Sequence, residues 1–178
     1  MMLTDREIQL SLENGQITVT PEPADDAFSS TSLDLTLDEP GAIWKARRGR
    51  PIRPGAKGYN YHRVAARQKK LSLANYHLAP RSFVLAWTRE TISLPSTSRV
   101  AARVEGKSSL ARLGVGIHVT APTIHAGFTG QIQLEIFNFG PNDIILDVGM
   151  RICEGSFEKT LGTPAKGYAG RFVGQAGT

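Results

Sequence analysis

The chain has 178 residues, of which 40% are hydrophobic and 21% charged, with a formal net charge of +5 at pH 7. This length suits one well-buried domain, and no apolar run approaches the ~20 residues that a membrane-spanning helix needs. The single cysteine, Cys153, excludes an intrachain disulfide, and the first residues do not have the pattern of a secretory signal. We therefore expect one domain, residues 1–178, in a cytoplasmic protein without membrane partners.

A short helix is predicted first, over residues 5–14. Thr4 and Glu7 have the spacing of a capping box, in which the two residues satisfy each other's hydrogen bonds at a helix start. Gly15 follows as a stop signal.

Strands are predicted for most of the remaining chain. The segment TSLDLTL alternates Leu33, Leu35 and Leu37 with polar residues, as a half-buried strand does. Further strand-length runs, rich in β-branched and aromatic residues, cover 71–80, 82–95, 99–106, 114–120, 130–140 and 143–158. Many short strands at this spacing favour an all-β sandwich or barrel over a βαβ fold.

Residues 38–70 are rich in Gly, Pro and Arg, which predicts long loops around a short strand near Ile43 and Trp44. No acidic residue lies between Glu39 and Glu90. That interval holds Lys45, Arg47, Arg48, Arg50, Arg53, Lys57, Arg63, Arg67, Lys69, Lys70, Arg81 and Arg89. The charge indicates an anionic partner. A solvated basic loop is favoured over a nucleic-acid groove, because Tyr59 and Tyr61 are the stacking candidates interleaved with these cations.

The last residues, 159–178, contain five glycines and Pro164 and lack hydrophobic periodicity. They are predicted to form a flexible arm without regular structure.

Anion-binding groups gather in one short segment, EGKSSLARLG at 105–114. Lys107, Ser108, Ser109 and Arg112 supply the ammonium, hydroxyl and guanidinium donors that bind a polyphosphate. The glycine spacing is neither that of a P-loop nor that of a dinucleotide-binding loop. A basic, serine-containing surface turn without a ligand stays the alternative.

Glu135 lies in the predicted strand 130–140. If Ile132, Leu134 and Ile136 share the core face, Glu135 points to the opposite face. A carboxylate flanked by apolar residues is costly to bury unless it serves a site or a partner. Both a site residue and a solvent-facing glutamate fit the pattern.

The segment VEGKSSLARLGVGIHVTAPTIHAGFTGQIQLEIFNFG, residues 104–140, resembles the central part of the dCTP deaminases, a branch of the trimeric dUTPase superfamily. TDREI, SSTSLDLTL, YHLAPRSFVLAWTRETISLP and YAGRFVGQAG resemble other family segments in the same order, so the resemblance covers nearly the whole chain. It implies a distorted jelly roll, or dUTPase-like β-barrel, with short helices. It also implies a homotrimer with sites between subunits, and an arm, 159–178, that closes over the nucleotide.

The resemblance further implies hydrolytic deamination of dCTP to dUTP and ammonia. Glu135 would be the general acid and base, Ser108 and Arg112 would hold the attacking water and the carboxylate, and Lys107 and Ser109 would bind phosphate. Other substrate contacts implied by the resemblance are Leu110, Ala111, His118, Val119, Ala121, His125, Gln133, Leu134, Tyr168, Arg171 and Gln175.

No protein metal site is predicted. The four histidines and one cysteine form no C-x-x-C or H-x-x-x-H pair, and the H-x-E and P-C-x-x-C signature of zinc deaminases is absent. Zinc is therefore not expected, whereas Mg²⁺ would bind through the substrate triphosphate. The small-molecule ligands implied are dCTP, dUTP and dTTP.

Four positions depart from the family pattern, among them Val148 and Glu154, where the family commonly has proline and a small or amide residue. His125 stands where the family usually has an aspartate, and Thr123 where deaminases that act only on dCTP often have an arginine. Two alternatives therefore stay open. One is a bifunctional enzyme that forms dUMP and diphosphate. The other is a non-catalytic relative that binds nucleotides or nucleic acid, of which nucleic-acid binding is the less expected.

Overall fold

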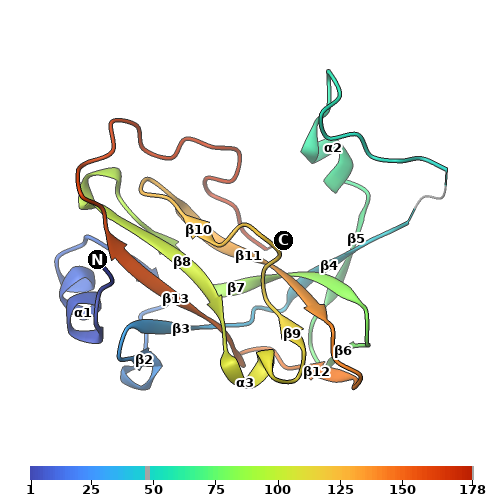
Figure 1. Cartoon of the computed structure of the whole chain (residues 1–178), viewed down its shortest axis with the longest axis horizontal. Helices are drawn as coiled ribbons and strands as arrows, with labels where there is room; N and C mark the ends of the chain where they lie inside the picture. The colour runs from blue at the N-terminus through green and yellow to red at the C-terminus, as the bar shows by residue number, and fades with distance from the viewer. Residues whose placement is uncertain (47–48, 178) are drawn as a thin grey trace.

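The computed structural model describes residues 1–46 and 49–177 and is mostly β-structure with a few short helices (Figure 1). Arg47 and Arg48, two of the predicted basic residues, lie outside the described residues. The helices are α1 (Asp5–Glu13), α2 (Tyr61–Ala65), α3 (Ser108–Ala111) and the 3₁₀ turns η1 (Asp25–Ala27) and η2 (Ser96–Ser98). No helix in the described ranges is long and apolar enough to cross a membrane.

The N-terminal helix follows its sequence signals. The backbone N–H and the hydroxyl of Thr4 both donate to the Glu7 carboxylate, at 2.8 and 2.7 Å, which confirms the capping box. Gly15 has a positive φ of 66°, a conformation that glycine adopts without strain, and α1 ends before it.

Two large antiparallel sheets hold most of the strands. The five-stranded sheet has the order β10 (Thr123–Ile124), β8 (Val100–Gly106), β13 (Arg151–Lys159), β3 (Ser32–Thr36), β2 (Phe28–Ser29). The six-stranded sheet has the order β5 (Gln68–Ser72), β4 (Pro40–Trp44), β7 (Phe83–Ser93), β11 (Thr129–Asn138), β9 (Val115–Gly116), with β1 (Thr18–Thr20) paired to β7. A two-stranded sheet joins β12 (Ile144–Leu146) and β6 (Tyr76–Leu78). The pairings of the described residues thus form three sheets, and they close no barrel.

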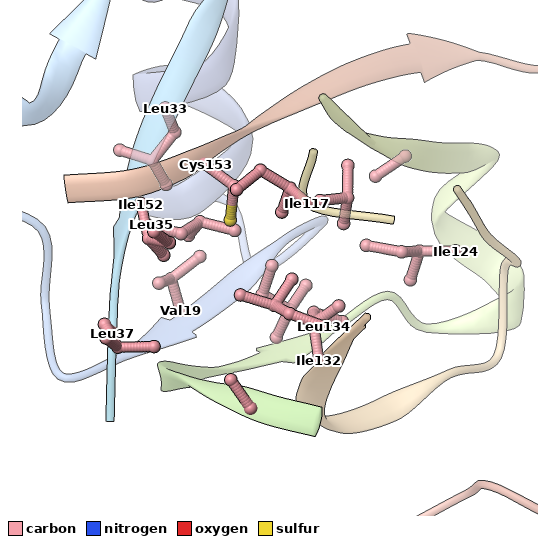
Figure 2. Packing of buried hydrophobic residues seen from close by; sticks show 14 of the residues in the cluster. Val19, Leu33, Leu35, Leu37, Ile117, Ile124, Ile132, Leu134, Ile152 and Cys153 are labelled. Atoms are coloured by element: carbon pink, nitrogen blue, oxygen red, sulfur yellow. The ribbon is translucent and has the colours of Figure 1, made fainter. Parts of the chain in front are cut away.

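The hydrophobic core lies between the large sheets. Figure 2 shows Leu35 of β3 near Cys153 of β13, with Leu134 of β11 further away beside Ile132, and Leu35, Cys153 and Leu134 are fully buried. The predicted half-buried strand 32–36 is buried on both faces, because Asp34 on the opposite face is covered as well. Asp34 is 8% exposed and forms ion pairs with Lys107 and Arg151, so its charge is compensated.

A bulge in β7 sets the register of β11. Between the pairs Gln131↔Thr91 and Gln133↔Trp87, β7 has extra residues. The Thr88 hydroxyl accepts from Ile132 N–H at 3.0 Å, which satisfies a backbone donor that the bulge leaves free. After the bulge, regular pairing continues through Glu135↔Leu85. Ile132, Leu134 and Ile136 are buried, which confirms the predicted core face of this strand.

Two predicted segments differ from the structure. Residues 38–70 were expected to be loops around a short strand, but they contain α2 and the start of β5. The Asn60 side chain accepts from Arg63 N–H at 3.2 Å and caps α2. The strand predicted over 114–120 is limited to Val115–Gly116. Beyond it, Ile117 O still accepts from the Glu135 N–H, but the Val119 N–H donates to the Glu135 side chain.

Candidate functional site

The predicted acid and the C-terminal arm meet at one cavity of about 370 Å³. Its walls come from α2, β10 and β11, from the turn after β10, and from the arm. The residues lining it are Tyr61, Val104, Ala121, Pro122, Thr123, Ile124, His125, Phe128, Ile132, Gln133, Glu135, Tyr168, Phe172 and Gln175. A larger cavity of about 560 Å³ between α1, β1 and η1 contains none of the predicted site residues. The smaller cavity is therefore the candidate site.

Glu135 is the half-buried carboxyl group of this cavity. Its backbone N–H donates to Ile117 O at 2.9 Å, and the Val119 N–H donates to Oε2 at 3.3 Å. Burial raises the pKa of Glu135 above its ordinary value, while the Val119 hydrogen bond and the nearby His118 lower it in part. A carboxyl group with a raised pKa is better suited to return a proton than an exposed one.

His118 lies on the same side of β11. Its Nδ1 atom is buried and has no hydrogen-bond partner among the described residues. An unsatisfied polar atom of this kind is costly unless a ligand or a water completes its bonding.

The C-terminal arm is docked along β11 by backbone hydrogen bonds. Gly174 N–H donates to Thr129 O at 2.6 Å, and Gln131 N–H donates to Gln175 O at 3.0 Å. The Gln175 side chain also donates to Gln131 O, at 2.9 Å. The described part of the arm, residues 160–177, contains no helix or strand, as its composition predicted, whereas its flexibility stays a prediction.

Tyr168 holds the arm against the turn before β11. Its N–H donates to Ala126 O at 2.8 Å, and its ring stacks on His125 with a centroid distance of 5.6 Å. A Cβ atom at Gly127 would lie 2.5 Å from Tyr168 N, and Gly127 has a positive φ of 94°. Glycine at 127 is therefore a condition for this close approach.

The predicted phosphate-binding segment, which contains α3, does not line the candidate cavity. α3 is at the lower edge of Figure 1, whereas the arm runs across the top. Ser108, Ser109 and Arg112 are exposed, and their side chains form no hydrogen bond or ion pair with other described residues. Lys107 instead forms an ion pair with Asp34, and none of these four residues lines the candidate cavity.

The structure thus divides the predicted site residues into two groups. Glu135, Ala121, His125, Gln133, Tyr168 and Gln175 line the cavity, and His118 and Val119 lie next to Glu135. Lys107, Ser108, Ser109, Leu110, Ala111 and Arg112 belong to the segment around α3.

Leu134 and Arg171 belong to neither group, and neither lines the cavity. Leu134 is fully buried in the core, and Leu110 packs partly against the core. Arg171 is exposed and is not among the residues that line the cavity, although its neighbour Phe172 is.

Tyr61 and Phe172 are cavity residues that the sequence did not assign to the site. Tyr61 lies in the basic segment, where it was considered only as a stacking candidate for nucleic acid. Phe172 lies between two residues that the resemblance assigned, Tyr168 and Gln175. No periodic pattern marks either residue, because Tyr61 begins the five-residue helix α2 and Phe172 lies in the arm, which has no helix or strand.

No group of three or more His, Cys, Asp or Glu side chains in the described ranges is placed to hold a metal ion.

Proteins of known family are similar to this chain. A family model described as dCTP deaminase-like matches residues 2–160. The dCTP deaminase of Rhodospirillum rubrum is 36% identical over 175 residues, covering 95% of this chain and 88% of that protein. The dUMP-forming dCTP deaminase of Aquifex aeolicus is 38% identical over 179 residues, covering 99% of this chain and 92% of that protein.

Solved structures show the same fold at lower identity. The 2'-deoxycytidine 5'-triphosphate deaminase of Agrobacterium tumefaciens has a TM-score of 0.67 at 22% identity, covering 89% of this chain, which spans 48% of that protein's length. A mutant dUTPase from phage phi11 of S. aureus, described with a structural Mg(II) ion, has a TM-score of 0.53 at 10% identity and covers 86% of this chain and 97% of that one. The fold is therefore dUTPase-like, and the chain belongs to the dCTP deaminase-like family.

Proposed function

We propose that this chain is a hydrolytic deaminase that converts dCTP and water into dUTP and ammonia, with Glu135 as the general acid and base. The observation that carries the proposal is the Glu135 carboxyl group, half-buried at a cavity with its pKa raised by burial. The relatives named dCTP deaminase, which align with nearly the whole chain, give the substrate.

The reaction needs one group that accepts a proton and later returns it. Ionised Glu135 would remove a proton from water, and the hydroxide would add to C4 of the cytosine. The same carboxyl group would give this proton to the ring nitrogen N3. It would then take the proton of the new C4 hydroxyl and pass it to the amino nitrogen, so that C4=O forms, the C4–N bond breaks and ammonia leaves. The Val119 N–H, at 3.3 Å from Oε2, would hold the carboxylate in place during these steps.

We further propose that the site is completed between the subunits of a homotrimer. The separation of α3 from the cavity supports this arrangement, since Ser108 and Arg112 of one subunit could then reach Glu135 of another. Lys107, Ser109 and the arm would bind the triphosphate, and dCTP would enter as its magnesium complex. A cytoplasmic location suits the one thiol, Cys153, which is buried and unpaired.

Replacing Glu135 with glutamine tests this function. Glu135→Gln keeps the shape of the side chain but removes the proton acceptor, so ammonia release from dCTP should fall by about 10³-fold. The affinity for dCTP, measured by calorimetry, should change only a few-fold. Glu22→Gln is the matched control, because Glu22 is exposed and lies outside the candidate cavity.

Two results would contradict the proposal. Undiminished turnover by Glu135→Gln would remove the assigned role of the acid. Strong, salt-dependent DNA binding by the wild-type protein without nucleotide turnover would instead favour the binding-only relative.

A second candidate function is the bifunctional reaction that continues to dUMP and diphosphate. The similarity to the dUMP-forming enzyme of Aquifex aeolicus favours it. His125, which stacks on Tyr168 at the cavity, occupies the position at which the family usually has an aspartate. Chromatography of the products decides between the two reactions, because diphosphate forms only in the bifunctional one.

A further inference from the structure

Among the described residues of the basic segment between β4 and β5, Tyr61 lines the candidate cavity. α2 begins at Tyr61, after the cap residue Asn60. Tyr61 is half-buried and lines the same cavity as Glu135, whereas Tyr59, two residues earlier, does not line it. The start of α2 therefore forms part of the site wall.

Tyr61 also contacts the C-terminal arm. Its ring packs edge-to-face on Phe172, with a centroid distance of 5.6 Å and an interplanar angle of 86°. Edge-to-face packing at this distance is a favourable geometry for two aromatic rings. Two segments that are distant in the sequence thus meet at the cavity through this pair of rings.

The Glu135 carboxyl group acts electrostatically on the Tyr61 hydroxyl. Burial raises the pKa of Tyr61, and the Glu135 carboxylate raises it further, while the side chain of Gln68 lowers it in part. Tyr61 and Glu135 therefore line one cavity and interact electrostatically.

We infer that Tyr61 is a further substrate-binding residue, whose ring, with Phe172, forms an aromatic wall against the pyrimidine base. This inference rests on the proposed function. Because Glu135 must reach C4 of the base, a ring beside Glu135 contacts the base and not the triphosphate. Aromatic rings bind bases through their flat faces, and the wall also shields the carboxyl group from bulk water.

The contact with Phe172 makes this wall depend on the arm. When the arm docks along β11, Phe172 supports the Tyr61 ring from the side. Substitutions at the two positions should therefore be non-additive in their effect on nucleotide affinity.

Binding can be measured without turnover in the Glu135→Gln background. There, Tyr61→Ala should raise the Kd for dCTP about tenfold, as for the loss of one base-stacking ring. Tyr61→Phe should bind within a few-fold of the background, since it keeps the ring. Tyr59→Ala is the matched control and should leave the Kd unchanged. Calorimetry gives the Kd, and thermal melting shows that each variant is folded.

A second variant keeps the inference testable if Tyr61→Ala does not fold. Tyr61→Leu retains bulk but removes the flat ring, and should raise the Kd several-fold. Combined with Phe172→Ala, it should raise the Kd by less than the product of the two single effects.

The outcomes separate this inference from the proposed function. If Glu135→Gln binds dCTP, and folded Tyr61→Ala or Tyr61→Leu binds it as tightly as Tyr59→Ala, the role of Tyr61 is overturned and the deaminase proposal stands. If folded Glu135→Gln binds no dCTP while the Glu22→Gln control does not turn it over, the proposed function fails, and the inference fails with it.

Discussion

Glu135 is held in a position that costs stability. The alternation along β11 could be predicted from the sequence and placed Glu135 opposite the core. Whether it faced solvent or a cavity could not be predicted, because the covering residues come from α2 and the arm, which are far away in the chain and have no periodic pattern. Half-burial favours the protonated form of the side chain, which is the physical origin of its raised pKa.

This raised pKa predicts a pH-dependent gain in stability for Glu135→Gln. The pKa is higher in the folded chain than in the unfolded chain, so this group's contribution is fully present below its ordinary value of 4.5 and is lost as the pH rises through the folded value. Glu135→Gln should therefore melt at a higher temperature than wild type at pH 8, with a difference that shrinks towards pH 4.5. Glu22→Gln should show no such trend, and a pH-independent difference would contradict this account.

At the scale of elements, the sequence predicted those features that depend on a few neighbouring residues. The capping residues of α1 and the alternation of β11 are read from a few neighbouring residues, and both were confirmed. α2 was missed because five residues are too few to show a helical period. The predicted strand 114–120 was mostly wrong because the paired residues end at Gly116, and the Val119 N–H then donates to the Glu135 side chain, a tertiary interaction.

The docking of the arm depends on the turn before β11, and a substitution at Gly127 tests this dependence. Gly127→Ala would place a Cβ atom 2.5 Å from Tyr168 N, at a residue whose φ of 94° is already unfavourable for alanine. We expect the arm to be displaced, trypsin to cleave faster at Lys166 and Arg171, and the KM for dCTP to rise about tenfold. Gly162→Ala, which has open space around its Cβ position, is the control. Unchanged cleavage and KM in folded Gly127→Ala would show that this contact is dispensable.

On the scale of the whole molecule, the resemblance to the dCTP deaminases predicted the fold family, which is confirmed, whereas the roles it implies for residues on β11 stay predictions. Propensity and spacing alone reached only an all-β domain with two open candidate segments. The separation of those segments within one chain could not be predicted from residue types, because it depends on the order of the strands in the sheets. α3 follows β8 of the five-stranded sheet, whereas Glu135 belongs to β11 of the six-stranded sheet.

Mixing two inactive variants tests the shared site. Glu135→Gln and Arg112→Ala each damage a different side of the proposed interface. After subunit exchange at equal concentrations, about three quarters of the random trimers contain both variants. Each mixed trimer has one complete site of three, so the mixture should recover about a quarter of wild-type activity. Ammonia release before and after exchange gives the result. The absence of any recovery, with exchange confirmed by mass spectrometry, would indicate that each site uses a single chain.

The basic segment has a kinetic consequence because its α2 end forms part of the cavity wall. Arg50, Arg53, Lys57, Arg63 and Arg67 are exposed, and no acidic residue interrupts them. Their field would attract a diffusing nucleotide polyanion towards the cavity from beyond contact range. Raising the ionic strength should then slow the encounter and lower kcat/KM at constant magnesium, while kcat, which is set after the complex has formed, stays nearly constant.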